Sequence, residues 1–323
     1  MDHITVLVLA DPTESRLAML EELPPETSIA VGNSAEAFVR AAPDATVIFN
    51  WSLAGDLQRE VFRMCPKLEW VHSRSAGLDG LLFPELVESP ARLTNGSGLY
   101  SESLGEFVVG AILYFAKDLR RMIRNQAAGA WEPFDIVEVH GQTVGIVGYG
   151  DIGRAVATRV RALGMRVLGV KRHGPPARND DPLAERIYGP EGLIEMISRS
   201  DYVVVAAPLT PETMGLIGEP VIAAMKPDAV LINVGRGPVI EEAALVKALS
   251  EKRIKGAALD VFDTEPLPEG HPFYKLENVL LSPHCADHTP DWLDQAMRFF
   301  LAQFERFRKG EPLKNVVDKK LGY

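Results

Sequence analysis

The feature of this chain that most constrains its fold is a series of short apolar runs that alternate with helical patterns. From residue 143 onward these runs are Thr143–Val147, Arg166–Val170, Tyr202–Ala206, Ala229–Ile232, Gly256–Leu259 and Asn278–Leu281. Each run is short, rich in apolar or β-branched residues and bounded by turn residues, as expected of a buried strand. Helices are predicted between them, for example over Ile152–Leu163 and Glu241–Ser250. This alternation predicts parallel strands joined by crossover helices, and therefore an α/β fold.

A second alternating series occupies the first hundred residues. Its predicted strands are Ile4–Leu9, Ala45–Phe49 and Glu69–His72, and its predicted helices are Ser34–Ala42 and Asp56–Met64. With 323 residues, and about 150 residues per domain as a prior, two series predict two domains.

Two long helices are predicted at the borders of these series. The first starts at Ser101 or Ser103, which has capping-box spacing to Glu106, and continues to about Arg124. It is apolar on more than one side, which indicates burial on more than one side. The second has Thr289 as N-cap and Pro290 in its first turn, and we expect it to return the chain to the first domain. The alternative is that it packs on the edge of its own domain. The predicted domains are residues 1–98 with 290–323, and residues 99–289.

Charge and cysteine content exclude several classes of protein. The chain has 34 basic and 44 acidic residues, a net charge of -10, which argues against nucleic-acid binding or a basic membrane patch. No apolar run approaches the roughly 18 residues of a membrane span, and Asp2 and His3 are unlike the start of a secretory signal. The two cysteines, Cys65 and Cys285, form no CxxC pattern, and the histidines have no metal-ligand spacing. We therefore expect no metal site, and a reducing cytoplasmic environment.

A glycine-rich loop directly follows the strand Thr143–Val147. Its residues are Gly148, Tyr149, Gly150, Asp151, Ile152 and Gly153, in the pattern GxGxxG. Between a strand and a helix this pattern is typical of a dinucleotide site, with the pyrophosphate on the helix N-terminus. The alternative is an ordinary glycine-rich turn. A Walker-type phosphate loop is excluded because Arg154-Ala155 stands where Lys-Ser/Thr is required.

The acidic residue that normally binds the ribose 2′-hydroxyl of NAD is missing. The sequence has no Asp or Glu between Asp151 and Asp180, and Lys171, Arg172 and His173 follow the second strand. Because cations pair with a 2′-phosphate, we expect NADP(H) to be preferred and NAD(H) to remain possible. The alternative is that these are solvated surface cations.

Polar residues with catalytic potential follow three further strands of the same series. Arg236 follows Ala229–Ile232, Glu265 follows Gly256–Leu259, and His284 follows Asn278–Leu281. Each alone could be an ordinary surface or capping residue. Doubly wound sheets, however, bind their ligands at the carboxyl ends of their strands.

These motifs together resemble the D-isomer-specific 2-hydroxyacid dehydrogenase family. The resemblance is carried by the glycine loop and by the segments 208–213 (PLTPET), 233–237 (NVGRG), 260–266 (DVFDTEP) and 282–284 (SPH). It implies two Rossmann-like domains with doubly wound parallel sheets, the substrate domain being flavodoxin-like and discontinuous. It also implies an active site between the domains, and a homodimer built through the cofactor domain and the long helix.

The resemblance further implies roles for individual residues. His284 matches the acid/base, Glu265 its carboxylate partner, and Arg236 the substrate-binding arginine; Gly77 and Leu78 match the loop that holds the substrate carboxylate. The implied cofactor-binding residues, besides the glycine loop and the cations 171–173, are Ala207, Pro208, Thr213, Val234, Gly235, Arg236, Asp260, His284 and Ala286.

The expected activity is hydride transfer between a nicotinamide and C2 of a small 2-keto or D-2-hydroxy acid. An imidazolium can protonate the keto oxygen near neutral pH, and a neighbouring carboxylate raises its pKa. The substrate would be glyoxylate, hydroxypyruvate or a larger analogue, and Glu265 argues against formate because the formate-oxidising branch of the family has glutamine there. The alternative is a dinucleotide-sensing, corepressor-like protein on the same fold.

The roles of five further residues are left open. Asp287 and His288 could contact the cofactor or substrate, or lie in a loop that faces solvent, which is slightly favoured. Cys285 is predicted to be a packed thiol and not a nucleophile. Trp51 and Trp131 are predicted to be core or interface aromatics, with Trp51 as a candidate for lining the substrate pocket.

Overall fold

The computed structural model describes residues 3–172 and 181–323, which form two compact units. The first unit combines the chain up to Tyr100 with Thr289–Tyr323, and the second unit is Ser101–His288. His173, one of the predicted cofactor-binding residues, lies outside the described residues. That the first unit binds substrate and the second binds cofactor remains a prediction.

The first unit is built around a parallel sheet with the strand order β2-β1-β3-β4-β5. This is the order of flavodoxin-like folds. Its elements are β1 (Thr5–Leu9), η1 (Ser15–Glu22), β2 (Ser28–Gly32), η2 (Ala35–Phe38), η3 (Ala42–Asp44), β3 (Val47–Asn50), α1 (Gly55–Arg63), β4 (Trp70–Ser73), α2 (Pro84–Glu88), β5 (Arg92–Thr94) and, after the second unit, α9 (Trp292–Arg308).

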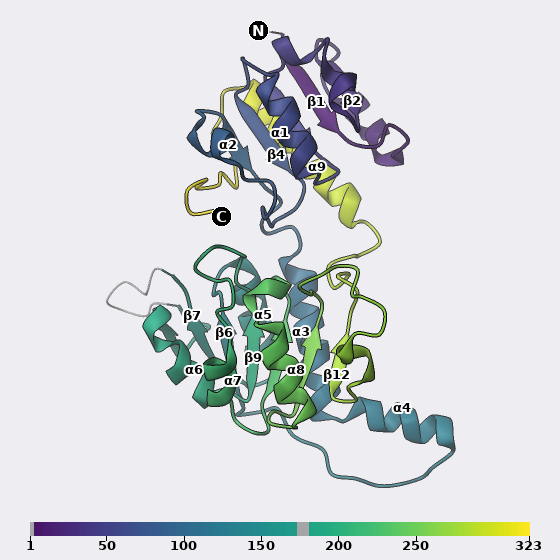
Figure 1. The fold of residues 1–323 in the computed structure, drawn as a ribbon, viewed down its shortest axis with the longest axis vertical. Coiled ribbons are helices and arrows are strands. Elements are labelled where there is room, and N and C mark those ends of the chain that lie inside the picture. The colour runs from purple at the N-terminus through teal and green to yellow at the C-terminus, as the bar shows by residue number, and fades with distance from the viewer. Residues whose placement is uncertain (1–2, 173–180) are drawn as a thin grey trace. The chain divides into compact units, whose positions relative to one another are not determined.

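Alternate residues of the first sheet enter separate hydrophobic clusters. Leu7 and Leu9 pack with the cluster that includes Val61 of α1, whereas Val6 and Val8 pack with the cluster that includes Phe300 of α9. Because successive side chains of a strand point to opposite faces, α1 and α9 cover opposite faces of the sheet (Figure 1). Helices on both faces make this a doubly wound unit.

The second unit contains a parallel sheet with the order β12-β11-β10-β9-β6-β7-β8. The central run of this order is that of Rossmann folds, with the switch point between β6 and β9. Its elements are α3 (Ser101–Ala116), α4 (Leu119–Ala128), β6 (Thr143–Val147), α5 (Asp151–Ala162), β7 (Arg166–Val170), β8 (Arg186–Tyr188), η4 (Pro190–Gly192), α6 (Leu193–Arg199), β9 (Tyr202–Val205), α7 (Glu219–Ala224), β10 (Val230–Asn233), η5 (Gly237–Val239), α8 (Glu242–Ser250), β11 (Gly256–Leu259), η6 (Pro272–Lys275) and β12 (Val279–Leu281). The predicted fold class is confirmed.

Helices α3 and α5 pack together, and glycine permits their close approach. A Cβ added to Gly105 of α3 would lie 3.2 Å from the backbone of Ala155 in α5. Helices α6, α7 and α8 pack against one another in sequence. Their apolar side chains, such as Met196 and Leu249, belong to one cluster with Val203 and Leu231 of the sheet.

The prediction of one continuous helix from Ser101 to Arg124 is wrong, because α3 ends at Ala116 and a separate helix, α4, begins at Leu119. Asp118 adopts the left-handed region (φ 47°), and its side chain accepts a hydrogen bond from Arg121 N as the N-cap of α4. Such a cap ends one helix and starts another in a new direction. Helix α4 and the segment after it extend away from the body of the second unit (Figure 1).

Two other helix predictions are also wrong. The segment Ser34–Ala42 forms the short 3₁₀ helix η2 and reaches the first residue of a second one, η3, instead of one α-helix. Phe38 is the only buried residue of the four in η2, so little apolar surface stabilises a longer helix there. Thr289 is not the N-cap of the last helix. That helix starts at Trp292, preceded by Asp291, so Pro290 lies outside it.

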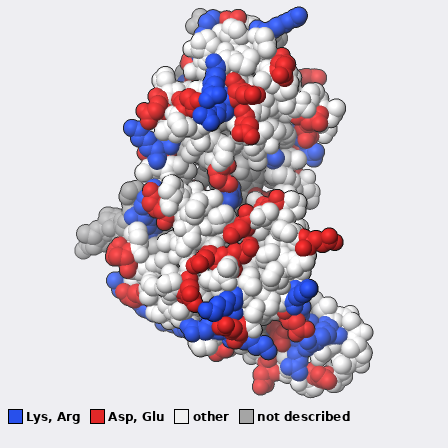
Figure 2. All heavy atoms as spheres, viewed as in Figure 1, with Lys and Arg blue, Asp and Glu red and all other residues white. Residues whose placement is uncertain are grey.

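The surface of the molecule mixes charges of both signs over the face shown in Figure 2. Within the described ranges, no helix is long and apolar enough to cross a bilayer. The same part of the chain contains no group of His, Cys, Asp or Glu side chains suited to hold a metal ion. Trp51 is in the core at 4% exposure, whereas Trp131 is 96% exposed and is not a core residue.

Candidate active site

The glycine loop has the conformation that a dinucleotide site requires. Gly148 has φ 90°, and a Cβ there would lie 2.5 Å from Ala207 N, so no other residue fits. A Cβ on Gly153 would lie 2.7 Å from Gly148 O, so this glycine allows α5 to pack against the loop. At Gly150, just before α5, a Cβ would meet no atom of the described chain within 4 Å. The loop therefore leaves room above the N-terminus of a 12-residue helix, and it fits a pyrophosphate.

Tyr149 contributes to this loop mainly through packing. Its side chain is 5% exposed, and a Cβ added to Gly169 of β7 would lie 2.7 Å from the tyrosine ring. Burial raises the pKa of Tyr149 to about 12. The backbone N–H groups of Gly148 and Tyr149 both donate to Val170 O at 3.0 Å, which joins the loop to the end of β7. Asp151, the first residue of α5, is exposed, and Ile152 is half-buried.

Lys171 and Arg172 follow β7 at the same edge of the sheet. Lys171 N donates to Tyr188 O at 3.2 Å. Arg172 Nη2 donates to Glu212 Oε2 at 2.8 Å and to Thr210 Oγ1 at 3.2 Å. Glu212 was not predicted from the sequence as a site residue, although it lies within a motif that was recognised.

The segment from Ala207 to Thr213 is tightly folded after β9. Thr213 Oγ1 donates to Pro208 O at 2.6 Å and accepts a hydrogen bond from Thr210 N at 2.8 Å. Ala207 lies against Gly148, as the glycine contacts show. Of the predicted cofactor-binding residues in this segment, Ala207 thus lies directly against the glycine loop.

Arg236 is positioned by the residue that ends β10. Asn233 is 1% exposed; its Oδ1 accepts a hydrogen bond from Gly235 N at 3.0 Å, and its Nδ2 donates to Arg236 O at 3.1 Å. Arg236 Nη1 donates to Gly235 O at 2.9 Å. The amide of Asn233 thereby shapes the turn around Val234, Gly235 and Arg236. A buried polar residue at the end of a strand was the available signal, but the sequence did not reveal its partners.

Glu265 and His284 are in direct contact. Glu265 Oε2 lies 2.7 Å from His284 Nδ1, and Glu265 Oε1 accepts a hydrogen bond from Phe262 N at 2.9 Å. The hydrogen bond and charge of Glu265 raise the pKa of His284, more than burial and Arg236 lower it. Burial raises the pKa of Glu265, but the hydrogen bonds from His284 and Phe262 N outweigh it and lower the pKa overall. The two side chains are 34% and 41% exposed, so both still reach solvent.

The turn that carries His284 is organised by Asp260. Asp260 is 1% exposed, and its Oδ1 accepts hydrogen bonds from Ser282 Oγ at 2.5 Å, Cys285 N at 2.9 Å and Ala286 N at 3.1 Å. His284 itself has φ 52°. The prediction that Cys285 is a packed thiol is wrong: its N–H points to Asp260 and the residue is exposed.

Asp287 and His288 differ in their exposure. The side chain of Asp287 is 20% exposed and that of His288 is 42% exposed, with 3.7 Å between Oδ1 and Nε2. Burial raises the pKa of Asp287, and the charge of Asp260 acts in the same direction. His288 is thus the more exposed of the two, and the role of each residue remains a prediction.

Gly77 and Leu78 belong to the first unit and follow β4. Leu78 is 3% exposed and packs in the core. The preceding backbone is held by three hydrogen bonds, namely Asn95 Nδ2 to Ala76 O at 2.7 Å, Gly96 N to Ser75 O at 2.9 Å and Tyr100 Oη to Arg74 O at 2.7 Å. These hydrogen bonds hold the backbone that leads into the turn at Gly77 and Leu78.

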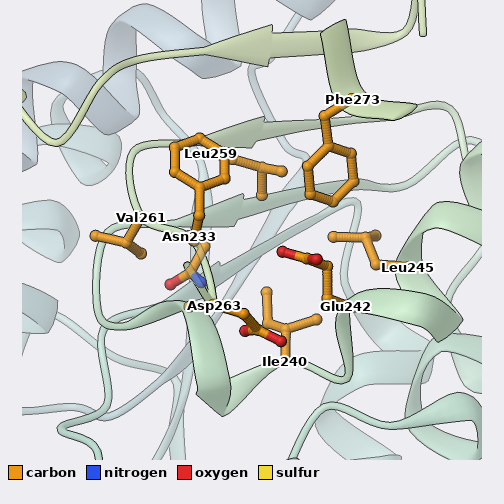
Figure 3. Close-up of a pocket in the computed structure, with 10 residues that line it drawn as sticks. Asn233, Ile240, Glu242, Leu245, Leu259, Val261, Asp263 and Phe273 are labelled. Atoms are coloured by element: carbon orange, nitrogen blue, oxygen red, sulfur yellow. The ribbon is translucent and has the colours of Figure 1, made fainter. Parts of the chain in front are cut away.

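A small hollow lies beneath the loops that carry Arg236 and Glu265. Asn233, Glu242 and Asp263 line it together with apolar residues that include Phe273 (Figure 3). Glu242 Oε1 lies 3.0 Å from His271 Nε2. Burial and the charge of Glu242 raise the pKa of Asp263. Because most of its lining residues are apolar, we interpret this hollow as part of the packed layer that supports the loops of Arg236 and Glu265.

Fold and site together define a class of protein. The glycine loop, Arg236, Glu265 and His284 follow β6, β10, β11 and β12, so all lie at the carboxyl edge of one parallel sheet. A glycine loop at the switch point and a histidine paired with a carboxylate are the machinery of a dinucleotide-dependent oxidoreductase.

Comparisons with known proteins identify the family. Residues 109–286 match the family model described as D-isomer specific 2-hydroxyacid dehydrogenase, NAD binding domain. The chain is 35% identical over 277 residues to a glyoxylate reductase of Korarchaeum cryptofilum, covering 83% of this chain and 82% of that protein. It is 37% identical over 262 residues to a hydroxyphenylpyruvate reductase of Plectranthus scutellarioides, covering 80% of this chain and 81% of that protein.

Among solved structures, the NADPH-dependent glyoxylate/hydroxypyruvate reductase of Sinorhizobium meliloti, in complex with NADP and sulfate, is similar at a TM-score of 0.85 and 28% identity. The match covers 99% of this chain and 100% of that chain. The protein belongs to the D-isomer specific 2-hydroxyacid dehydrogenase family and is an NAD(P)-dependent enzyme.

Proposed function

We propose that this enzyme is an NADP(H)-preferring reductase of small 2-keto acids such as glyoxylate or hydroxypyruvate, with His284 as the acid/base. The observation that carries the proposal is the 2.7 Å contact between His284 Nδ1 and Glu265 Oε2 at the edge of the sheet that carries the glycine loop. The glyoxylate reductase and the glyoxylate/hydroxypyruvate reductase among its relatives support the substrate class.

In the proposed reaction, His284, Glu265 and Arg236 have separate roles. When bound, the nicotinamide supplies the hydride to the keto carbon or accepts it in the reverse direction. Because His284 Nδ1–H donates to Glu265, the proton exchanged with the keto oxygen is carried on Nε2. Ionised Glu265 stabilises the imidazolium. Arg236 holds the carboxylate and the keto oxygen, whose negative charge grows during the reaction.

The substrate carboxylate is assigned to backbone N–H groups of the first unit. Gly77 and Leu78 lie in a turn whose backbone is held by Asn95 and Tyr100. N–H donors that are held in place before the substrate arrives lower the entropic cost of binding.

The preference for NADP(H) rests on the cations at the end of β7. The position that holds an acid in NAD-specific sites is occupied by Lys171 and Arg172. The residue before them, Val170, accepts hydrogen bonds from Gly148 N and Tyr149 N of the glycine loop. The guanidinium of Arg172 can form charge-assisted hydrogen bonds with a 2′-phosphate. The S. meliloti relative was solved with NADP.

Steady-state kinetics with a panel of keto acids and both cofactors test this function. The double variant Lys171→Asp with Arg172→Ala should lower kcat/KM for NADPH by about 10²–10⁴-fold relative to NADH, since it removes two cations and each charge-assisted hydrogen bond contributes about 1.5–3 kcal/mol. Lys252→Asp with Arg253→Ala makes the same charge change at another Lys-Arg pair of the second unit and is the control. A wild type that prefers NADH would overturn the cofactor preference, and NADPH binding without turnover would identify a sensor instead of a reductase.

A further inference from the structure

We infer that Glu212 is a specificity-determining residue that limits the preference for NADP(H), by holding Arg172 in an ion pair with which the 2′-phosphate must compete. The inference rests on the proposed preference for NADP(H). The sequence showed the family motif that contains Glu212. The contact of Glu212 with Arg172, which follows β7, appears only in the folded chain.

The ion pair spans the switch point of the second sheet. Arg172 follows β7, and Glu212 follows β9; in the sheet these two strands are the neighbours of β6, one on each side. The contact from Arg172 Nη2 to Glu212 Oε2, at 2.8 Å, therefore connects loops on both sides of the strand that leads into the glycine loop. A dinucleotide bound at the carboxyl edge lies at this switch point.

Glu212 projects from a rigid segment. Thr210 is 6% exposed, and its N–H is capped by Thr213 Oγ1 at 2.8 Å. The N–H groups of Thr213 and Met214 both donate to Thr210 O, at 3.1 and 3.0 Å. The carboxylate is thus presented by a folded turn and not by a loose loop.

Glu212 is ionised at neutral pH. The hydrogen bond from Thr210 lowers the pKa of Glu212 most, and the charge of Arg172 lowers it further. Thr210 Oγ1 also accepts from Arg172 Nη2 at 3.2 Å, so one threonine hydroxyl serves both members of the pair. The charge of Arg172 is therefore partly neutralised before any cofactor binds.

NADPH and NADH interact differently with the ion pair between Arg172 and Glu212. A 2′-phosphate, with a charge near −2, must compete with the Glu212 carboxylate for the guanidinium of Arg172. A 2′-hydroxyl carries no charge and leaves the ion pair intact. Glu212 thus weakens the binding of NADPH selectively, which keeps NADH usable.

Glu212→Gln tests the inference, because it removes the charge and keeps the size and an oxygen that can accept from Arg172. The dissociation constants of NADPH and NADH would be measured by fluorescence titration of the full-length enzyme at low and high salt. We expect NADPH to bind about twofold to fivefold more tightly and NADH to change little, an effect that shrinks at high salt. Glu219→Gln is the matched control, since Glu219 is 69% exposed against 67% for Glu212 and also forms an ion pair, with Lys247.

A double-mutant cycle with Arg172→Ala separates the possible outcomes. The inference requires that Glu212→Gln lose its effect on NADPH once Arg172 is alanine. If Arg172→Ala weakens NADPH alone but Glu212→Gln leaves NADPH unchanged or weakens it, the inference fails and the proposed preference stands. If Arg172→Ala and Lys171→Asp change both cofactors alike, the proposed preference fails and the inference fails with it.

Discussion

His284 and Glu265 form an acid–base pair in which each residue stabilises the charged form of the other. Their contact raises the pKa of the imidazole and lowers that of the carboxylate. Asp260 supports this pair indirectly, because its buried carboxylate accepts hydrogen bonds from the N–H groups of the two residues that follow His284. The activity should therefore depend on pH through His284.

Reduction of the keto acid needs the imidazolium of His284. We expect kcat/KM for reduction to be high at low pH and to fall as pH rises through the raised pKa, whereas oxidation of the hydroxy acid should rise over the same range. Glu265→Gln removes the charge that stabilises the imidazolium and should move both inflections to lower pH. His284→Ala should lose on the order of 10²–10⁴ in kcat.

The measurement is a pH–rate profile in both directions for the wild type and the two variants. An inflection that stays in place in Glu265→Gln, with chemistry rate-limiting, would contradict the role of the carboxylate. Near-normal turnover by His284→Ala would contradict the role of the histidine.

At the scale of elements, Lys319 in the C-terminal segment caps the C-terminus of the short helix α2 in the first unit. Lys319 Nζ donates to Leu86 O at 2.9 Å, Ser89 O at 2.6 Å and Ala91 O at 2.9 Å. Helix α2 ends at Glu88, so its last carbonyl groups are among those that lack partners within the helix. Burial lowers the pKa of Lys319, which nevertheless remains an ammonium donor at these carbonyls.

Lys319→Met should destabilise the first unit by about 1–3 kcal/mol, because carbonyls that lose a charged donor are left partly buried. Urea unfolding followed by tryptophan fluorescence reports this, since Trp51, Trp70 and Trp292 all lie in the first unit. Lys320→Met removes the same charge at the next, exposed residue and should change the midpoint little. Equal midpoints for the two variants would refute the capping role.

At the scale of the whole molecule, the second unit exposes apolar side chains along α4 and the segment that follows it. They are Leu119 (36%), Met122 (40%), Ile123 (63%), Trp131 (96%) and Ile136 (53%). The family resemblance implied a homodimer built through the cofactor domain and the long helix, but α3 buries its own apolar stripe, for example Val108 and Ile112, within the unit. The surface left to be covered is therefore that of α4, and a second copy of this chain is our proposal for what covers it.

Light scattering at micromolar concentration should show a dimer or a multiple of one. Ile123→Asp with Trp131→Asp should shift the protein toward monomer, because each change would bury a charge in an apolar interface. Val39→Asp, at a residue of the first unit with 58% exposure, is the control and should leave the mass unchanged. A monomeric wild type would show that α4 is not an interface.

The sequence by itself determined the position and type of the buried strands. A strand covered on both faces is typically a short apolar run, and β1, β3, β6, β7 and β9 all have this pattern and are buried throughout or nearly so. The glycine loop was equally predictable, because Gly148 and Gly153 occupy places where a Cβ would collide with the backbone.

Elements that few features of the local sequence indicate were not predicted. Strand β2 lies at the edge of its sheet with only Gly32 buried, and β5 and β8 have three residues each, so no apolar run marks them. The break at Asp118 was also missed, since an aspartate that can cap a helix through its side chain is equally compatible with an exposed position inside one.

For the site, the sequence determined which chemical groups would stand at the ends of which strands, and in what order. Only the tertiary structure decided their partners: Asn233 with the Arg236 turn, Asp260 with the His284 turn, and Glu212 with Arg172. The physical reason is that a parallel sheet brings the ends of distant strands to one edge. Hydrogen bonds between those ends depend on distances of about 3 Å, which residue types and spacing along the chain do not specify.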